Sequence, residues 1–237
     1  MCEQYVAVSA ETFRIDALWP FTERLERFGI AGFGWGATWL DADGTLRSHR
    51  DTGTFRDDPA REAVGRNETR AVLVHLRRPS KFSTIGIPDT QPFDDPAGRY
   101  AFSHNGELEN HRPYRARYRE AGRILGKADT EVGARWLEDE WAAAESVPGV
   151  LGKLRDTFGG HANLAVLTTS GEAHHYAGNQ ENPVFTFDLG GIRLACTGMY
   201  SLDRSVFKYV VPEASNRKLI PLARTATLSA DQPVTTH

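Results

Sequence analysis

Hydrophobic and polar residues follow two periods along this chain, and the two periods separate predicted strands from predicted helices. Short runs that alternate, or that are apolar between turn residues, predict strands. These strands cover residues 3–8, 71–75, 100–103, 161–168, 173–177, 184–188 and 192–196. Tight turns at Asp43-Gly44, Ser170-Gly171 and Gly190-Gly191 predict hairpins.

Apolar residues at spacings of three and four predict the helices. These cover residues 15–28 (beginning near Pro20), 58–64, 110–120, 129–145 and 148–158. Hairpins mix with helices, and strands and helices do not alternate regularly. The pattern therefore predicts an antiparallel α+β domain rather than a parallel sheet. We expect a single domain over residues 2–230 and a frayed tail at residues 231–237, where the pattern loosens.

Composition narrows the function classes. The chain has 237 residues, of which 40% are hydrophobic and 25% charged, and its net charge is −3. This composition is typical of an ordinary globular protein. The absence of a basic surplus argues against a nucleic-acid partner. No apolar stretch reaches membrane-spanning length and no signal peptide is recognisable, so we expect a cytoplasmic protein with no membrane partner. Two cysteines do not form a disulfide framework.

Cys2 is the first candidate for chemistry. Removal of Met1 would leave Cys2 with a free α-amine, whose pKa is about 7.7–8. One residue would then hold a thiol nucleophile and a base that activates it. The alternative is that Cys2 is only the first residue of a strand.

Two further stretches offer binding groups at strand ends. Arg77 and Arg78 follow a buried strand directly, and a guanidinium pairs with a carboxylate through two parallel bonds. A solvated loop is the alternative there. Asn105-Gly106 ends another strand and is typical of a hairpin turn. Because a helix follows it, the side-chain amide and a backbone N–H could instead converge as an oxyanion hole.

Asp129 opens the predicted helix 129–145. It is either a helix cap or a carboxylate aimed at a substrate ammonium group. Other motifs carry no function: the stretch 32–37 has the glycine spacing of a dinucleotide site but follows a helix and precedes a strand. His174 and His175 are adjacent on a strand and point to opposite faces. We therefore expect no metal and no cofactor.

Four motifs in this order resemble the glutaminase domain of class II glutamine amidotransferases, which are N-terminal-nucleophile (Ntn) hydrolases. The motifs are Cys2, His75-Leu76-Arg77, His104-Asn105-Gly106 and Asp129-Thr130-Glu131. The short length and the opening Cys2-Glu3 are closest to the stand-alone members of that family. The resemblance implies the Ntn-hydrolase fold, a four-layer αββα sandwich of two antiparallel sheets.

The resemblance also implies a role for each matched residue. Cys2 would attack the γ-carboxamide carbon of glutamine, and Asn105 with the Gly106 N–H would hold the oxyanion. Arg77 would pair with the substrate α-carboxylate, and Asp129 would pair with its α-ammonium group.

Three residues near the expected substrate depart from the family pattern. Ser80 stands where the family usually has Thr near the substrate, Gln91 stands where it has His, and Arg78 replaces a small or aromatic residue. These changes concern the substrate pocket rather than the nucleophile.

The expected function is hydrolysis of glutamine through a Cys2 thioester, which releases glutamate and ammonia. A separate synthase subunit would receive the ammonia. One alternative is a hydrolase of another γ-glutamyl small molecule, whose carboxylate-bearing leaving group a basic rim of Arg78 and Lys81 would suit. A second alternative is a non-catalytic ligand-binding relic of the fold.

Overall fold

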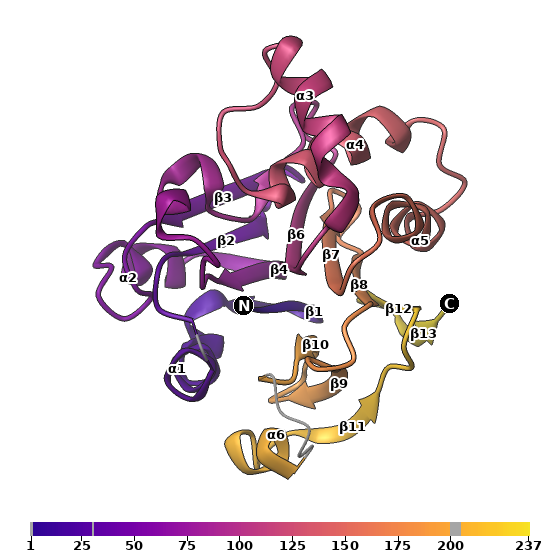
Figure 1. Ribbon diagram of the computed structural model, residues 1–237. Coiled ribbons are helices and arrows are strands. Elements are labelled where there is room, and N and C mark those ends of the chain that lie inside the picture. Colours follow the sequence, from indigo (N-terminus) through magenta and orange to yellow (C-terminus); the bar gives the residue numbers. More distant parts are fainter. Residues whose placement is uncertain (1, 30, 200–204) are drawn as a thin grey trace.

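Two antiparallel sheets face each other at the centre of the molecule (Figure 1). The computed structural model describes residues 2–29, 31–199 and 205–237. In their order across the first, seven-stranded sheet, the strands are β11 (Ser215–Leu219), β9 (Val184–Leu189), β10 (Ile192–Thr197), β1 (Glu3–Arg14), β4 (Glu68–Leu76), β2 (Trp35–Leu40) and β3 (Leu46–Asp51). The six-stranded sheet runs β13 (Gln232–Thr236), β12 (Arg224–Ser229), β8 (Ala173–Ala177), β7 (Ala162–Thr168), β6 (Tyr100–Gly106) and β5 (Phe93–Asp94).

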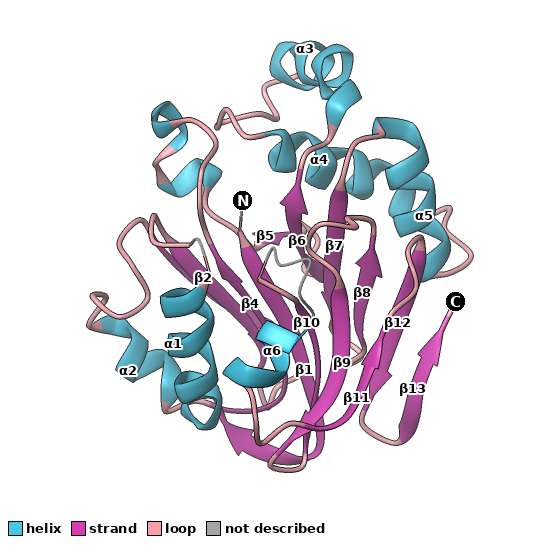
Figure 2. Cartoon of the chain, turned by 60° about the horizontal axis from the view of Figure 1, so that its bottom comes forward, coloured by secondary structure: helices cyan, strands magenta, loops and turns pink. Residues whose placement is uncertain are grey.

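Helices cover the outer face of each sheet (Figure 2). Outside the seven-stranded sheet lie α1 (Trp19–Phe28), α2 (Ala60–Gly65) and α6 (Ser205–Val210). The other side carries α3 (Arg112–Glu120), α4 (Asp129–Trp141) and α5 (Val147–Phe158). Short 3₁₀ turns precede α1 (η1, Ile15–Leu18) and α3 (η4, Glu109–His111), and two more, Phe82–Thr84 and Ile87–Asp89, lie in the long connection between β4 and β5. This arrangement confirms the four-layer αββα sandwich.

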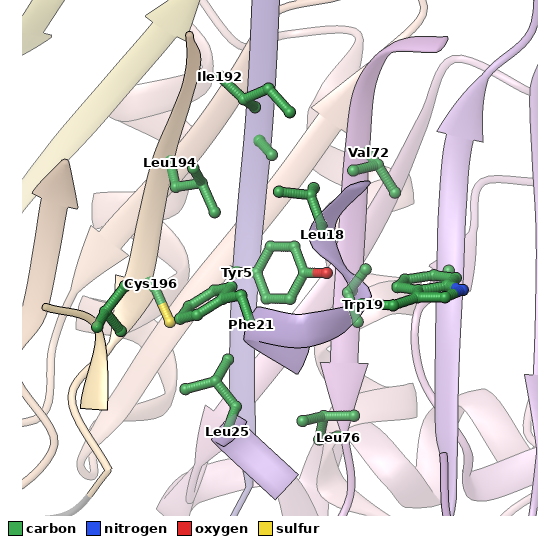
Figure 3. Close-up of a cluster of buried hydrophobic side chains, with 14 of the residues drawn as sticks. Tyr5, Leu18, Trp19, Phe21, Leu25, Val72, Leu76, Ile192, Leu194 and Cys196 are labelled. Atoms are coloured by element: carbon green, nitrogen blue, oxygen red, sulfur yellow. The ribbon is translucent and has the colours of Figure 1, made fainter. Parts of the chain in front are cut away.

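The first part of strand β1, residues 3–9, is buried, and its run of four apolar residues from Tyr5 to Val8 packs on both faces of the sheet. Tyr5 and Ala7 pack against the helical layer, where Tyr5 lies among Leu18, Phe21 and Cys196 (Figure 3). Val6 and Val8 point the other way, into the core between the sheets. Because β4 and β10 pair with β1 on either side, the start of this strand is held in the middle of the sheet.

The C-terminal residues differ from the prediction. A frayed tail was expected at residues 231–237, but Gln232–Thr236 form strand β13, which pairs with β12 at Ala226↔Thr236. The expected tail was wrong because an edge strand faces solvent and needs few apolar residues, whereas Val234 and the threonines beside it still favour extended backbone. Helix α4 also ends at Trp141, four residues before its predicted end.

Candidate active site

A cavity of about 490 Å³ opens beside the start of β1. Five of the six residues predicted to form the site line this cavity: Cys2, Arg77, Ser80, Gly106 and Asp129. The sixth, Asn105, lies directly behind Cys2 and is fully buried. The fold therefore brings together residues from well-separated segments of the chain.

The Cys2 thiol lies against the backbone of Arg78. The Arg78 N–H donates to Sγ at 3.2 Å, and Sγ lies 3.5 Å from the Arg78 carbonyl oxygen. Burial raises the pKa of the thiol, and the positive chain terminus, the Arg78 N–H and the Arg77 guanidinium oppose this shift only in part. The thiol is thus mostly protonated near neutral pH, and a nucleophilic role requires a base beside it.

Asn105 contacts the main chain of Cys2 with both ends of its amide. Its Oδ1 accepts from the Cys2 N–H at 3.3 Å, and its Nδ2 donates to the Cys2 carbonyl oxygen. Asn182 adds a long bond to the same carbonyl oxygen at 3.5 Å. These contacts fix the nucleophile relative to strand β6.

Gly106 is the last residue of β6 and adopts a φ of +133°. A Cβ atom at this residue would lie 1.8 Å from the carbonyl oxygen of His161, so no other residue fits without a backbone shift. The chain then turns, and the Glu107 N–H donates to the same carbonyl at 3.1 Å. This turn leads into η4 and α3 rather than into a hairpin, as the sequence predicted.

Arg77 extends from the end of β4 and is 3% exposed. Its Nη2 donates to the carbonyl oxygen and to Oγ1 of Thr84, at 2.7 and 2.9 Å. Its Nη1 is buried and has no hydrogen-bond partner in the part of the chain that the structure describes. A buried guanidinium with one uncommitted nitrogen on a cavity is suited to a carboxylate ligand.

Asp129 is the first residue of α4, and its helix cap is Ala128, so the capping alternative does not describe it. Its Oδ2 accepts from the Leu108 N–H at 2.7 Å, which ties the carboxylate to the turn after Gly106. Asp89 anchors the same loop from the other side by accepting from the N–H groups of Lys127 and Ala128. The Asp129 carboxylate is thereby held at the same cavity as Arg77.

Sequence reasoning missed several residues of this site. Ser80 lines the cavity and is exposed, but Thr84 is the residue that orients Arg77. His104 and Thr130 belong to the sequence motifs but were assigned no role, although both line the cavity. A side chain that acts through another side chain leaves no spacing signal, so only the geometry reveals these roles.

Part of the chain is similar to known proteins. Residues 85–162 match the family model described as a glutamine amidotransferase domain. Over this stretch the chain is similar to glutamine amidotransferase domains. Over 87 residues it is 39% identical to the glutamine–fructose-6-phosphate aminotransferase (isomerizing) of Streptomyces coelicolor, an alignment that covers 33% of this chain and 14% of that protein.

Solved structures show the same fold over the whole length of this chain. The glutamine phosphoribosylpyrophosphate amidotransferase of B. subtilis superimposes with a TM-score of 0.75 at 15% identity, covering 100% of this chain and 49% of that one. A class-II glutamine aminotransferase domain protein from Silicibacter pomeroyi gives 0.59 at 16% identity, covering 99% and 98%. This chain thus spans about half of the first structure, and its match covers a smaller part of the S. coelicolor relative. These structures share the fold of this chain, in which two sheets lie between layers of helices.

No helix among the described residues is long and apolar enough to cross a membrane. The His, Cys, Asp and Glu side chains of residues 2–29, 31–199 and 205–237 include no group of three or more that could hold a metal ion.

Proposed function

We propose that this chain hydrolyses the γ-carboxamide of glutamine through a thioester on Cys2, with release of glutamate and ammonia. One observation carries the proposal: the thiol shares its cavity with a buried arginine that has an uncommitted nitrogen and with a fixed carboxylate. Arg77 and Asp129 would bind the two charges on the α-carbon of a free amino acid. The family match at residues 85–162 supports glutamine as that amino acid.

In the proposed reaction, removal of Met1 exposes the α-amine of Cys2. This amine takes the thiol proton as Sγ attacks the γ-carbon, so the high pKa of the buried thiol is overcome locally. The carbonyl oxygen becomes an oxyanion that Asn105 and the Gly106 N–H would hold. The protonated α-amine of Cys2 then gives this proton to the leaving nitrogen, and ammonia departs. Water cleaves the thioester to give glutamate and the free thiol.

The fate of the ammonia is part of the proposal. We propose that the described chain, including β13, forms one glutaminase unit and that a separate synthase subunit receives the ammonia, with Ser80 lining the glutamine site. The rival substrate is a γ-glutamyl conjugate, because Arg78 and Lys81 also line the cavity and would suit an anionic leaving group. A preference of a hundredfold or more in kcat/KM for such a conjugate over glutamine, about 2.7 kcal/mol, would overturn the choice of glutamine.

The decisive experiment combines activity with labelling of the nucleophile. Cys2→Ala should abolish glutamate release while the far-UV spectrum and the unfolding temperature stay close to those of the wild type. A glutamine-like electrophile should label the mature N-terminal cysteine. Cys196 is the matched control because it is a fully buried free thiol outside the cavity. Glutamine hydrolysis by Cys2→Ala at the wild-type rate, or a native protein that retains Met1, would refute the proposal.

A further inference from the structure

Three polar side chains behind the Asp129 side of the cavity form a directed chain of hydrogen bonds. Gln91 Oε1 accepts from the backbone N–H of His104 at 2.6 Å. Gln91 Nε2 donates to Thr130 Oγ1 at 3.2 Å, and Thr130 Oγ1 lies 3.0 Å from His104 Nδ1. All three residues are at most 4% exposed, and all three line the cavity.

The direction of every bond in this chain follows from its first member. A backbone N–H can only donate, so the oxygen of the Gln91 amide must face His104 and the NH₂ group must face Thr130. The Thr130 oxygen accepts this bond and keeps one proton of its own. His104 Nδ1 is the one further partner that the structure gives the Thr130 hydroxyl among the described residues. The hydroxyl therefore donates to Nδ1.

An imidazole that accepts at Nδ1 and is neutral carries its proton on Nε2. Burial lowers the pKa of His104, which keeps the ring neutral even though the Asp129 and Glu107 carboxylates oppose the shift. Nε2 is buried and has no hydrogen-bond partner within the described parts of the chain. A buried donor without a partner is costly, and His104 differs from the other buried histidines of this kind because it lines the cavity, where a ligand could accept the bond.

We propose that His104 is a substrate-binding residue whose Nε2–H donates to the α-carboxylate of the glutamyl substrate, and that Gln91 and Thr130 are positioning residues that fix this tautomer. The proposal rests on the proposed function for the identity of the substrate. His104 contacts Thr130, the neighbour of the Asp129 carboxylate that would bind the α-ammonium group. The α-carboxylate and the α-ammonium group of the substrate are attached to the same carbon. A substrate whose ammonium group is bound by Asp129 would therefore hold its α-carboxylate within reach of both the His104 Nε2–H and Arg77.

The chain supplies a matched control for this arrangement. His174 Nδ1 lies 3.0 Å from Thr227 Oγ1, the ring is 3% exposed, burial lowers its pKa to about 4, and its Nε2 also has no hydrogen-bond partner among the residues described. This pair does not line the cavity. Thr130→Val and Thr227→Val therefore remove the same hydroxyl from the same kind of pair, once at the cavity and once away from it.

The kinetic test separates a substrate contact from a structural role. His104→Asn keeps a partner for Thr130 but loses the donor at Nε2, and we expect KM for glutamine to rise roughly tenfold or more with kcat little changed, as for loss of a bond to a charged group. His104→Gln, which can extend an amide donor toward the Nε2 position, should restore much of the affinity. Thr130→Val should raise KM, Thr130→Ser should not, and Thr227→Val should leave both constants unchanged. Equal KM values for His104→Asn and the wild type, or a loss confined to kcat, would overturn the proposal.

A second measurement does not depend on turnover. Long-range ¹H–¹⁵N spectra of the Cys2→Ala protein report which nitrogen of each neutral histidine carries the proton. We expect the Nε2–H form for His104, and a shift of that signal when L-glutamate is added. An Nδ1–H signal, or no shift at saturating L-glutamate, would refute this inference while leaving glutaminase activity intact. Absence of glutaminase activity in the wild type, with the Nε2–H signal still responding to L-glutamate, would refute the proposed function and support this inference.

Discussion

Asn105 and Cys2 are joined by two hydrogen bonds although they lie 103 residues apart: Oδ1 accepts from the Cys2 N–H, and Nδ2 donates to the Cys2 carbonyl oxygen. These bonds connect the start of β1 in one sheet with the end of β6 in the other. The Asn105 side chain, one of the proposed oxyanion donors, thus fixes the position of the nucleophile on the opposite sheet.

Replacement of Asn105 by Ala should therefore affect both catalysis and stability. We expect kcat for glutamine hydrolysis to fall roughly 10²–10³-fold, the usual cost of one oxyanion donor. The buried Cys2 carbonyl would also lose a donor, which should lower the free energy of unfolding by about 1–3 kcal/mol. Steady-state kinetics and urea unfolding measure the two effects. A raised KM with an unchanged kcat would instead make Asn105 a ground-state binding residue.

Arg77→Lys should weaken substrate binding more than it slows the chemical step. The lysine keeps the charge but cannot bond to Thr84 and present a second nitrogen to a carboxylate as the planar guanidinium does. We expect KM for glutamine to rise roughly 10- to 100-fold. Arg99→Lys, in a partly buried pair with Asp95 away from the cavity, is the control and should leave KM unchanged. An unchanged KM in Arg77→Lys would remove Arg77 from the binding site.

Gly106→Ala should be far more harmful than an alanine at another glycine with positive φ. The new Cβ would overlap the His161 carbonyl, and we expect a loss of roughly 3 kcal/mol or more in the free energy of unfolding together with loss of activity. Gly98 has a φ of +71°, but a methyl group added there would have no heavy atom within 4 Å, so Gly98→Ala should cost only about 1–2 kcal/mol. Similar unfolding midpoints for the two variants would contradict the close approach at Gly106.

Glu3 should make the fold less stable as the pH rises toward neutrality. Burial raises the pKa of Glu3 to about 7, against weaker effects of hydrogen bonds from Thr197 and Asn182. Between the unfolded pKa near 4.5 and the folded pKa, the native state holds a proton that the unfolded chain has lost, so this contribution to stability is complete below pH 4.5 and is lost as the pH passes 7.

The test compares Glu3→Gln with the wild type at pH 5 and pH 8. The variant should gain stability relative to the wild type on going to pH 8, because Gln cannot ionise. Buried histidines with lowered pKa act in the opposite direction, but they are present in both proteins and cancel in the difference. A difference in unfolding free energy that does not change with pH would show that ionisation of Glu3 does not destabilise the fold.

The sequence predicted the fold class well because period and turn chemistry are local properties. The strand at residues 173–177 and the helix after Asn105-Gly106 were confirmed at their predicted places. The frayed C-terminus was wrong because the pairing of β13 with β12 is set by a neighbouring strand, which the local pattern does not contain.

The site was predictable to the extent that its residues belong to motifs. Five residues singled out from the motifs line one cavity: Cys2, Arg77, Ser80, Gly106 and Asp129. Thr84 and the bond between Gln91 and Thr130 could not be predicted, because they depend on which loop folds back on which strand. Gln91 departs visibly from the family pattern in the sequence, but the meaning of that departure required the direction of its hydrogen bonds.

The central place of β1 has a consequence for biosynthesis. This strand is synthesised well before its neighbour β10, which begins only at Ile192. At roughly 5–20 residues per second, translation needs on the order of ten to forty seconds to supply that neighbour. Throughout this interval the seven-stranded sheet cannot close around the N-terminus, so an aminopeptidase can reach it. We therefore expect Met1 to be removed before the seven-stranded sheet is complete. Pairing of β10 with β1 would then bury the new terminus at Cys2.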